Sequence, residues 1–181
     1  MRIISGKYRG KTIYPPKNLK VRPTTDFARE SLFNIICNHY HIEEITILDL
    51  FSGTGCISFE FASRGCPKIH LVENNFNQFS FIKKTIIELH FEQIKPIYTN
   101  VLPYIKSCRF DYDIVFADPP YDLDWLDSLP ELIFKHSLVK DNGWFILEHP
   151  KKYSFSSFPE FKDHRHYGGV NFSFFHMKAT S

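Results

Sequence analysis

The sequence predicts an α/β fold, in which a mainly parallel sheet carries helices on both faces. Apolar runs of strand length alternate with amphipathic segments of helical period from about residue 45 to residue 148. Turn-forming residues separate these segments, and polar motifs follow directly after several of the strands. A length of 181 residues allows a substantial core, so residues 1–181 are expected to form a single domain.

Residues 1–24 lack helical periodicity and are expected to form a basic arm ahead of a core that spans residues 25–181. Two short strands, at residues 2–4 and 11–14, are predicted around a turn, which gives a small amino-terminal β-hairpin. Residues 1–30 hold eight basic and two acidic side chains (+6), whereas the other 151 residues hold 14 basic and 18 acidic ones (−4). This asymmetry favours a polyanion such as nucleic acid as the partner of the arm, although a solvated terminus can also be basic.

The core is expected to begin with a helix that is capped by Thr25 and has Asp26 in its positive first turn. The apolar face of this helix comprises Phe27, Ala28, Ser31, Leu32, Ile35 and Ile36. Buried strands are predicted at residues 45–50, 68–72, 94–99, 112–117 and 144–148. Helices are predicted at residues 56–63, 78–90 and 101–106, and after a capping box at residues 128–131. A terminal hairpin is predicted at residues 163–167 and 171–177.

The composition disfavours several classes of protein. No apolar run approaches the ~20 residues of a membrane span, and the first residues become polar too early for a signal peptide. The four cysteines form no C-x-x-C pair, which favours free thiols in a reducing cytoplasm. The paired histidines are spaced i,i+2 and no H-E-x-x-H occurs, so no metal site is expected. A cytoplasmic protein without a membrane or metal partner is therefore expected.

A glycine-rich turn at residues 47–55 connects the first core strand to the next helix. Gly53 and Gly55 allow the backbone to turn sharply and to approach a ligand closely. A dinucleotide fingerprint would need a third glycine where Ser58 stands, and the lysine of a phosphate loop is missing. Asp49 precedes the turn, and its carboxylate suits the cationic sulfonium and ammonium groups of S-adenosylmethionine better than a pyrophosphate.

Two further polar residues end the following strands. Glu73 comes directly after Leu71 and Val72, where its carboxylate can accept hydrogen bonds from both ribose hydroxyls; the alternative is a surface acid. Asn100 ends the third strand, where its amide and the neighbouring Val101 can frame adenine, although asparagine is common at strand ends. Both positions are consistent with the same cofactor.

The tetrapeptide Asp118-Pro119-Pro120-Tyr121 follows the predicted strand at residues 112–117. At the carboxyl end of a strand, Asp118 and the Pro119 carbonyl can each accept an N–H bond from a planar amine, while Tyr121 stacks on its ring. The nitrogen lone pair would then point at an electrophile. A proline-rich turn without a ligand is the alternative, since aspartate and proline are common turn residues. The glycine-rich turn favours the functional interpretation.

Together with R-P-T at residues 22–24 and R-E-S-L-F at residues 29–33, these motifs resemble the RsmD family of class I S-adenosylmethionine-dependent methyltransferases. The resemblance covers almost the whole chain. It implies the Rossmann-like sheet of that class, which has seven strands, mostly parallel with one antiparallel strand from the last hairpin. It also implies methylation of the exocyclic N2 of a guanine in small-subunit (16S) ribosomal RNA, of the guanine(966)-N(2) type.

Charge and resemblance together place the expected site residues in three groups. The catalytic group is Asp118, Pro119, Pro120 and Tyr121. The group that binds S-adenosylmethionine is Asp49, Phe51, Ser52, Gly53, Thr54, Gly55, Glu73, Asn74, Asn100, Val101 and Asp118. The RNA-binding group is Arg2, Lys7, Arg9, Lys11, Arg22 and Arg29. The expected partner is ribosomal RNA or an assembling small ribosomal subunit, bound by a monomer.

Other functions use some of the same residues. A DNA adenine N6 methyltransferase shares the D-P-P-Y chemistry, but the segment between Asp118 and the terminal hairpin leaves no room for a separate target-recognition domain. A non-catalytic RNA-binding protein could keep the fold, but it would have no need of the complete set of motif residues. That set is Asp49, Gly53, Gly55, Glu73 and Asp118. A nicotinamide-dependent oxidoreductase is disfavoured by Ser58, which replaces the third glycine, and by Asp49, whose charge opposes a pyrophosphate.

Overall fold

The computed structural model describes residues 1–16 and 25–179, so the predicted RNA contact Arg22 lies outside the described residues. In chain order the elements are α1 (Asp26–Cys37), the 3-10 helix η1 (Ile42–Glu44), β1 (Thr46–Leu50), α2 (Cys56–Ser63), β2 (Lys68–Glu73), α3 (Phe76–Glu88), β3 (Ile94–Tyr98), α4 (Val101–Ser107), β4 (Tyr112–Ala117), α5 (Leu129–Lys135), β5 (Val139–His149), β6 (Phe161–Tyr167) and β7 (Val170–His176). Within the described ranges, no helix combines the length and the apolar character that crossing a membrane requires.

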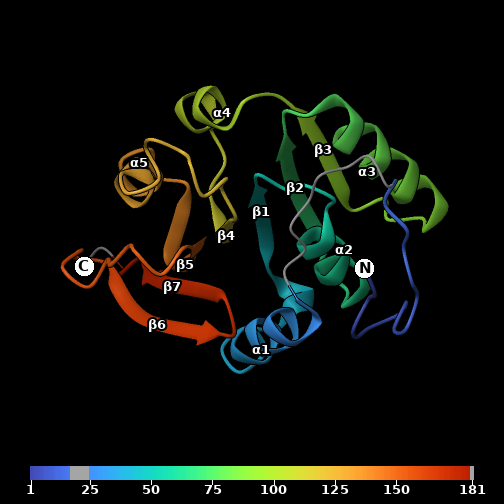
Figure 1. Ribbon diagram of the computed structural model, residues 1–181, viewed down its shortest axis with the longest axis horizontal. Helices are drawn as coiled ribbons and strands as arrows, with labels where there is room; N and C mark the ends of the chain where they lie inside the picture. The colour runs from blue at the N-terminus through green and yellow to red at the C-terminus, as the bar shows by residue number, and fades with distance from the viewer. Residues whose placement is uncertain (17–24, 180–181) are drawn as a thin grey trace.

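The seven strands form one sheet in the order β3-β2-β1-β4-β5-β7-β6 (Figure 1). Strands β1 to β5 pair in parallel, and β7 is antiparallel to both β5 and β6. The predicted mixed sheet, with one antiparallel strand from the terminal hairpin, is therefore confirmed. The strand order reverses at β1, which lies between β2 and β4, and open parallel sheets bind ligands at the carboxyl ends beside such a reversal.

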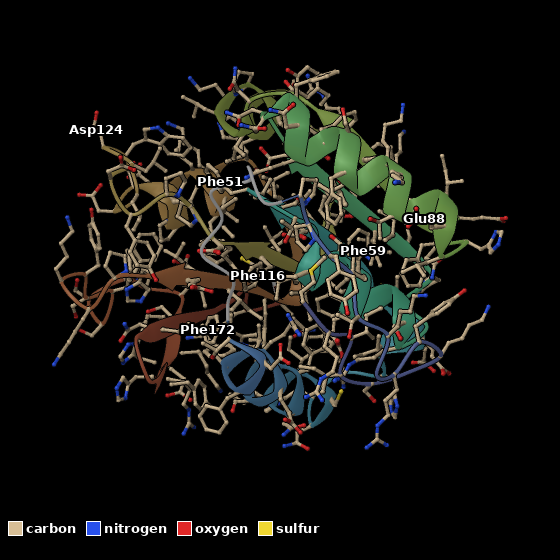
Figure 2. The ribbon with its side chains drawn as sticks, turned by 45° about the vertical axis from the view of Figure 1, so that its right-hand side comes forward. Phe51, Phe59, Glu88, Phe116, Asp124 and Phe172 are labelled. Atoms are coloured by element: carbon tan, nitrogen blue, oxygen red, sulfur yellow. The ribbon has the colours of Figure 1, made fainter. Side chains whose placement is uncertain are left out.

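Helices cover both faces of the sheet, because side chains along each strand alternate between two apolar clusters. On β1, Ile47 belongs to the cluster beneath α1, α2 and α3, whereas Leu48 belongs to the cluster beneath α4 and α5. Phe59 of α2 lies in the first cluster together with Phe116 and Phe172 of the sheet (Figure 2). Burial on both faces explains why these strands are continuous apolar runs in the sequence.

The two predicted helix caps have different outcomes. Thr25 caps α1 as predicted, since its backbone has φ −59° and ψ 150° and its hydroxyl accepts a bond from the Ala28 N–H at 3.2 Å. The prediction of a capping box at the start of α5 is wrong, because the Ser128 side chain makes no capping hydrogen bond. Ser128 has a helical backbone, with φ −87° and ψ −4°, and its hydroxyl donates to the Trp125 carbonyl at 2.9 Å.

The buried face of α1 differs from the prediction at three positions. Phe27 is 66% exposed, whereas Arg29 and Phe33, which the predicted face did not include, are buried. The Arg29 guanidinium donates to the Asp26 carboxylate at 2.9 Å and also to the Arg2 carbonyl. The predicted RNA contact at Arg29 is therefore wrong, because this side chain joins α1 to the amino-terminal segment and has no surface to offer a phosphate.

Residues 4–8 are hydrogen-bonded to α2, so the amino-terminal segment forms part of the folded body. The two predicted strands are reduced to an isolated antiparallel bridge between Arg2 and Thr12. The backbone N–H groups of Ile4 and Ser5 donate to the buried Glu60 carboxylate of α2 at 2.8 and 3.0 Å. The Glu60 carboxylate, which also forms an ion pair of 2.8 Å with Arg64, therefore holds the arm in place through charge-assisted hydrogen bonds.

Gly6 allows the arm to approach the end of α2. It has φ +81°, and a Cβ at this position would lie 1.9 Å from the Ser63 carbonyl oxygen. The Lys7 backbone N–H donates to that same oxygen at 2.7 Å. The predicted RNA contacts that remain exposed on the described part of the arm are Arg2, Lys7, Arg9 and Lys11.

Candidate active site

A cavity of about 510 Å³ opens at the carboxyl ends of β1, β2, β4 and β5, beside the reversal of strand order. Cavities of ~300–1,000 Å³ are typical of small-molecule sites. Most predicted site residues line it, namely Phe51, Ser52, Gly53, Thr54, Glu73, Asn74, Val101, Asp118, Pro119, Pro120 and Tyr121. Three predicted cofactor residues do not line it: Asp49, Gly55 and Asn100. The topology thus brings both sequence motifs to one cavity.

The turn between β1 and α2 borders the cavity in a left-handed backbone conformation. Phe51, Gly53 and Gly55 have φ values of 58°, 57° and 76°. Glycine adopts this region at little cost, and Gly55 also lacks room for a side chain, since a Cβ there would lie 3.1 Å from the Phe59 ring. The Gly53 N–H donates to the Glu73 carboxylate at 2.8 Å. Side chain and backbone together fix the shape of the turn.

Asp49 lies behind this turn. Its carboxylate is 1% exposed and accepts a hydrogen bond from the Ser58 hydroxyl at 2.6 Å. Burial raises the pKa of Asp49 to about 7, although the bonds from Ser58 act in the opposite direction. Asp49 supports the turn from within the core and does not line the cavity, so its contact with the cofactor stays a prediction. Ser58 stands where a dinucleotide fingerprint has its third glycine, and it supplies this supporting bond.

Glu73 ends β2 in the wall of the cavity and is 5% exposed. Its two oxygens accept backbone N–H bonds from Gly53 at 2.8 Å and from Asn75 at 2.7 Å. Burial raises the pKa of Glu73, and these backbone bonds oppose the shift. Because a carboxylate has about four acceptor positions, Glu73 keeps capacity for the paired hydroxyls of a ribose.

The ends of β2 and β3 are linked by their asparagines. The Asn74 amide donates to the Asn100 side chain at 2.9 Å, and Asn75 caps α3 by accepting two backbone N–H bonds. Asn100 lies just outside the cavity wall, whereas Val101, in the first turn of α4, lines it. Val101 therefore lies where an adenine could pack. Asn100 does not line the cavity itself but accepts a hydrogen bond from Asn74, which does.

The residues after β4 form the opposite wall. The Asp118 backbone N–H donates to the Leu50 carbonyl of β1 at 3.4 Å, which joins this wall to the glycine turn. Pro119 is buried and Pro120 is exposed, while Tyr121 is half-buried and lines the cavity. The predicted amine-holding carboxylate and aromatic ring are therefore neighbours at the same opening.

Glu148 is the acid at this site that the sequence analysis missed. It is 3% exposed, lines the cavity and accepts a hydrogen bond from the Tyr121 hydroxyl at 3.4 Å. Ala117 of β4 pairs with Leu147 of β5, so Asp118 and Glu148 follow at neighbouring positions. An acid directly after an apolar run is the sequence signal that could have found it. The other lining residues outside the predicted set are Cys56, Val72, Asn75 and Gln78.

The charges around the cavity have one sign. Glu73, Asp118 and Glu148 line it, and its described lining residues include no lysine or arginine. An acidic wall favours a cationic ligand and opposes a pyrophosphate. Within the parts of the chain that the structure describes, no group of three or more histidine, cysteine or acidic side chains is arranged to hold a metal ion.

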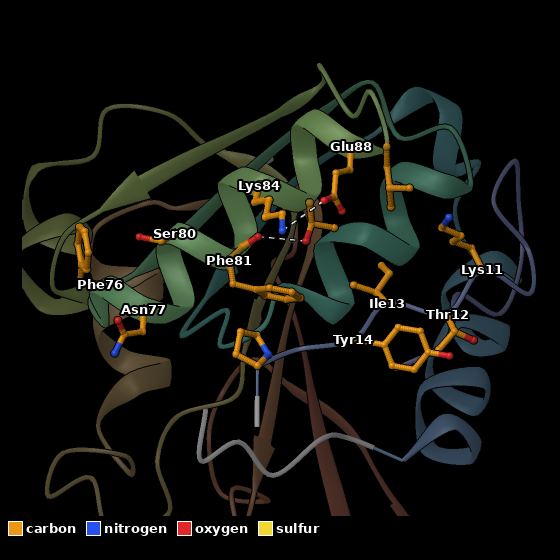
Figure 3. A pocket seen from close by; sticks show the side chains of 13 residues that line it. Lys11, Thr12, Ile13, Tyr14, Phe76, Asn77, Ser80, Phe81, Lys84 and Glu88 are labelled. Carbon is orange, nitrogen blue, oxygen red and sulfur yellow. Dashed lines mark hydrogen bonds and ion pairs between the residues drawn. The ribbon is translucent and has the colours of Figure 1, made fainter. Parts of the chain in front are cut away.

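A second cavity, of about 640 Å³, lies between residues 11–16 and α3 (Figure 3). Tyr14 and Phe76 line it and are 82% and 65% exposed. Lys84 and Glu88 form an ion pair of 3.7 Å along α3. This cavity contains neither the glycine turn nor the residues after β4, so its larger volume does not make it the reaction site.

Comparison with known proteins agrees with this geometry. The family model described as "Conserved hypothetical protein 95" matches residues 1–176. The ribosomal RNA small subunit methyltransferase D of Buchnera aphidicola subsp. Baizongia pistaciae is 34% identical over 148 residues, which cover 82% of this chain and 75% of that protein.

Two solved structures share the fold. A candidate methyltransferase of Escherichia coli, yhhF, superposes with a TM-score of 0.87 at 24% identity and covers 99% of both chains. A candidate methyltransferase solved with S-adenosylhomocysteine has a TM-score of 0.67 at 17% identity, over 83% of this chain and 48% of that one. The match along nearly the whole sequence and the shared architecture show that the chain belongs to the RsmD family of class I methyltransferases.

Proposed function

We propose that this chain transfers a methyl group from S-adenosylmethionine to the exocyclic N2 of a guanine in small-subunit ribosomal RNA, of the guanine(966)-N(2) type. One observation carries the proposal: the glycine turn with Glu73 and the motif at residues 118–121 meet at a single cavity. Relatives that are named ribosomal RNA small subunit methyltransferase D support the ribosomal substrate.

The β1–β2 side of the cavity fits the cofactor. Glu73 would accept bonds from the ribose hydroxyls, Val101 would pack against adenine, and the backbone of Gly53 leaves space for the amino-acid portion. An acidic lining suits a sulfonium cation. Bound there, S-adenosylmethionine would supply an electrophilic methyl group: as the new N–C bond forms, the C–S bond breaks and its electron pair stays on sulfur.

The β4–β5 side would hold the attacking amine. An aromatic amine is a weak nucleophile, because its lone pair is delocalised into the ring. Hydrogen bonds from its two N–H groups to the Asp118 carboxylate and the Pro119 carbonyl favour a more pyramidal nitrogen, whose lone pair points toward the methyl group. Much of the rate gain comes from this positioning. The proton that N2 then loses passes to Asp118 or to water.

Tyr121 and the arm would bind the rest of the substrate. Stacking of the guanine on Tyr121 is worth about 1–3 kcal/mol in comparable sites. A target inside a helix must be flipped out of its stack, whereas a loop nucleotide costs less. The exposed side chains of Arg2, Lys7, Arg9 and Lys11 would contact phosphates, which adds affinity without reading the sequence.

The test is nucleoside mass spectrometry after incubation with S-adenosylmethionine that carries a deuterated methyl group. Unmodified ribosomal RNA, assembled small subunits and genomic DNA are offered side by side. Labelled N2-methylguanosine in the RNA or in the particle is the expected result. Sequencing of the labelled fragment then tests whether the nucleotide is the proposed one.

Two other outcomes would contradict the proposal. Labelled N6-methyladenine in DNA would show that the substrate is DNA adenine, although the reaction would still be methylation of an exocyclic amine. No label in any substrate, together with measured cofactor binding and with a related guanine-N2 methyltransferase active on the same particles, would indicate a binding protein.

A further inference from the structure

Glu148 is a buried acid at the ligand cavity that the methyl transfer proposed above does not use. It is 3% exposed and accepts the Tyr121 hydroxyl bond at 3.4 Å. Its side chain lines the same cavity as Asp118 and Tyr121, so a polar group of a bound ligand can reach it there.

The strand register places Glu148 beside Asp118. Ala117 and Leu147 pair in parallel, and the residue after each of them lines the cavity. Neighbouring strands lie about 4.8 Å apart, so two carboxylates that line one cavity at this spacing can both reach one edge of a planar ligand. An ionised carboxylate accepts hydrogen bonds and donates none. A base that enters between them must therefore present two adjacent donors.

Guanine meets this requirement and adenine does not. The Watson–Crick edge of guanine carries the N2 amine beside N1–H, and both are donors. Adenine carries its N6 amine beside N1, which is an acceptor. Asp118 and the Pro119 carbonyl alone could hold the amine of either base.

We propose that Glu148 accepts the N1–H of the target guanine while Asp118 and Pro119 hold its N2 amine, so that Glu148 selects guanine and rejects adenine. The Tyr121 hydroxyl holds Glu148 at the edge of the base on which the tyrosine ring stacks. Adenine in the same place would turn its N1 lone pair toward a carboxylate. Sites that hydrogen-bond a substrate group reject analogues that lack it far more strongly than apolar pockets do. This inference rests on the proposed guanine methylation.

The test uses 2-aminopurine, which keeps the reacting N2 amine but has an acceptor at N1. Small-subunit particles are reconstituted with ribosomal RNA that carries either guanosine or 2-aminopurine at the methylated position, and initial rates of methyl transfer are compared. The wild-type protein should prefer guanosine by about 10- to 100-fold, the size expected for one hydrogen bond to a charged group.

Glu148→Gln makes the comparison specific, because the glutamine amide can still accept the Tyr121 bond and can also donate to N1 of 2-aminopurine. We expect the preference for guanosine to fall at least tenfold, through a slower reaction with guanosine and a faster one with 2-aminopurine. The loss of O6 in 2-aminopurine affects both proteins alike, so only the change in the ratio reports on Glu148. Calorimetric titration with S-adenosylmethionine verifies that the variant is folded.

Tyr121→Phe is the matched control, because it removes the hydroxyl but keeps the ring and the acid. Tyr121→Phe should lower the preference less than Glu148→Gln does, because Glu148 keeps its charge and loses only the hydroxyl that positions it. The inference is overturned if Glu148→Gln leaves the preference for guanosine at its wild-type value. It is also overturned if the wild-type protein methylates both particles equally well, a comparison that needs no variant. Failure of the proposed function looks different, since no labelled N2-methylguanosine would then form on the natural particle.

Discussion

The two sides of the cavity hold their acids in different ways. At the ends of β1 and β2, Glu73 is 5% exposed and accepts backbone N–H bonds at 2.8 and 2.7 Å. At the ends of β4 and β5, Asp118 is partly exposed, and the bond between Tyr121 and Glu148 is 3.4 Å long. Bonds in catalytic sites are often long without substrate and shorten when it binds. The cofactor side is therefore built in advance, whereas the amine side is expected to tighten around the entering base.

Replacing Asp118 with alanine should have the largest effect on catalysis. The amine would lose its charged acceptor, and turnover should fall by about 10³-fold, as when one preorganised transition-state contact is removed. Cofactor affinity should change by less than about threefold, because Glu73 and the glycine turn stay in place. Single-turnover rates and calorimetric titration with S-adenosylmethionine measure the two quantities separately.

Asp124→Ala is the control for that variant, since Asp124 is an exposed acid on the loop after the motif (Figure 2). It should retain the wild-type rate. Full activity of Asp118→Ala would refute the amine-holding role and remove the distinction between the two sides.

Glu73→Ala should show the converse behaviour. The ribose hydroxyls would lose their charged acceptor, and cofactor affinity should fall by about 10²-fold, with turnover at saturating cofactor nearly unchanged. Glu88→Gln, which changes an exposed acid of α3, is the control. A loss of turnover at unchanged affinity would place Glu73 on the chemical side and contradict the comparison.

Substitution of Asp49 tests how the buried carboxylate beneath the glycine turn contributes to stability. Its pKa is raised to about 7 by burial, so the folded state keeps a proton that the unfolded state releases near pH 4. The resulting stabilisation is fully present below the unfolded pKa and is lost as the pH rises through about 7. Between pH 5.5 and 7, wild-type protein should lose about 2 kcal/mol of unfolding free energy relative to Asp49→Asn, as the linkage relation gives for one such group.

Urea unfolding of both proteins at pH 5.5, 7 and 8 measures this difference. Asp127→Asn, a substitution of an exposed acid before α5, should follow the wild-type pH dependence. Parallel curves for wild type and Asp49→Asn would show that this carboxylate is ionised throughout the range, despite its burial behind the turn.

The sequence predicts the fold best where an element is apolar throughout and is sharply ended. Helix α2 and strand β4 have the predicted bounds, because glycine or polar residues stop both patterns. Strand β5 begins at Val139, well before the predicted residue 144, since Lys140, Asp141 and Asn142 interrupt the apolar run at its outer end. Hydrophobic period reports burial, and this end of the strand is partly exposed.

The site is predictable to the level of strand ends, but side-chain direction is not. Glu73 could be placed in the cavity wall from the sequence, because the last position of a buried strand fixes how far along the sheet the side chain lies. Glu148 has the same pattern without a recognisable spacing around it, and spacing alone does not show that Asp49 turns inward to Ser58. Arg29 appears as one of many basic residues near the arm, and only the packing of α1 against that arm shows that it is buried.

The smallest effect is expected outside both sides of the cavity, at the exposed basic side chains of the arm. Replacing Arg9 and Lys11 with alanine should weaken RNA binding and lower the slope of log affinity against log salt by about 1 for each phosphate that is no longer neutralised. Cofactor affinity should not change. Fluorescence anisotropy with ribosomal RNA at several salt concentrations measures the slope, and Lys106→Ala, at an exposed lysine of α4, is the control.

The double variant should keep the arm in place, because docking uses other groups. Backbone N–H donors of residues 4, 5 and 7 bind Glu60 and Ser63 at 2.7–3.0 Å, and alanine at positions 9 and 11 leaves these bonds intact. An unchanged salt slope would mean that this face of the arm does not meet RNA. Loss of cofactor binding together with RNA binding would mean that the arm stabilises α2 and the glycine turn ahead of it, and the arm would then belong with the preorganised side of the site.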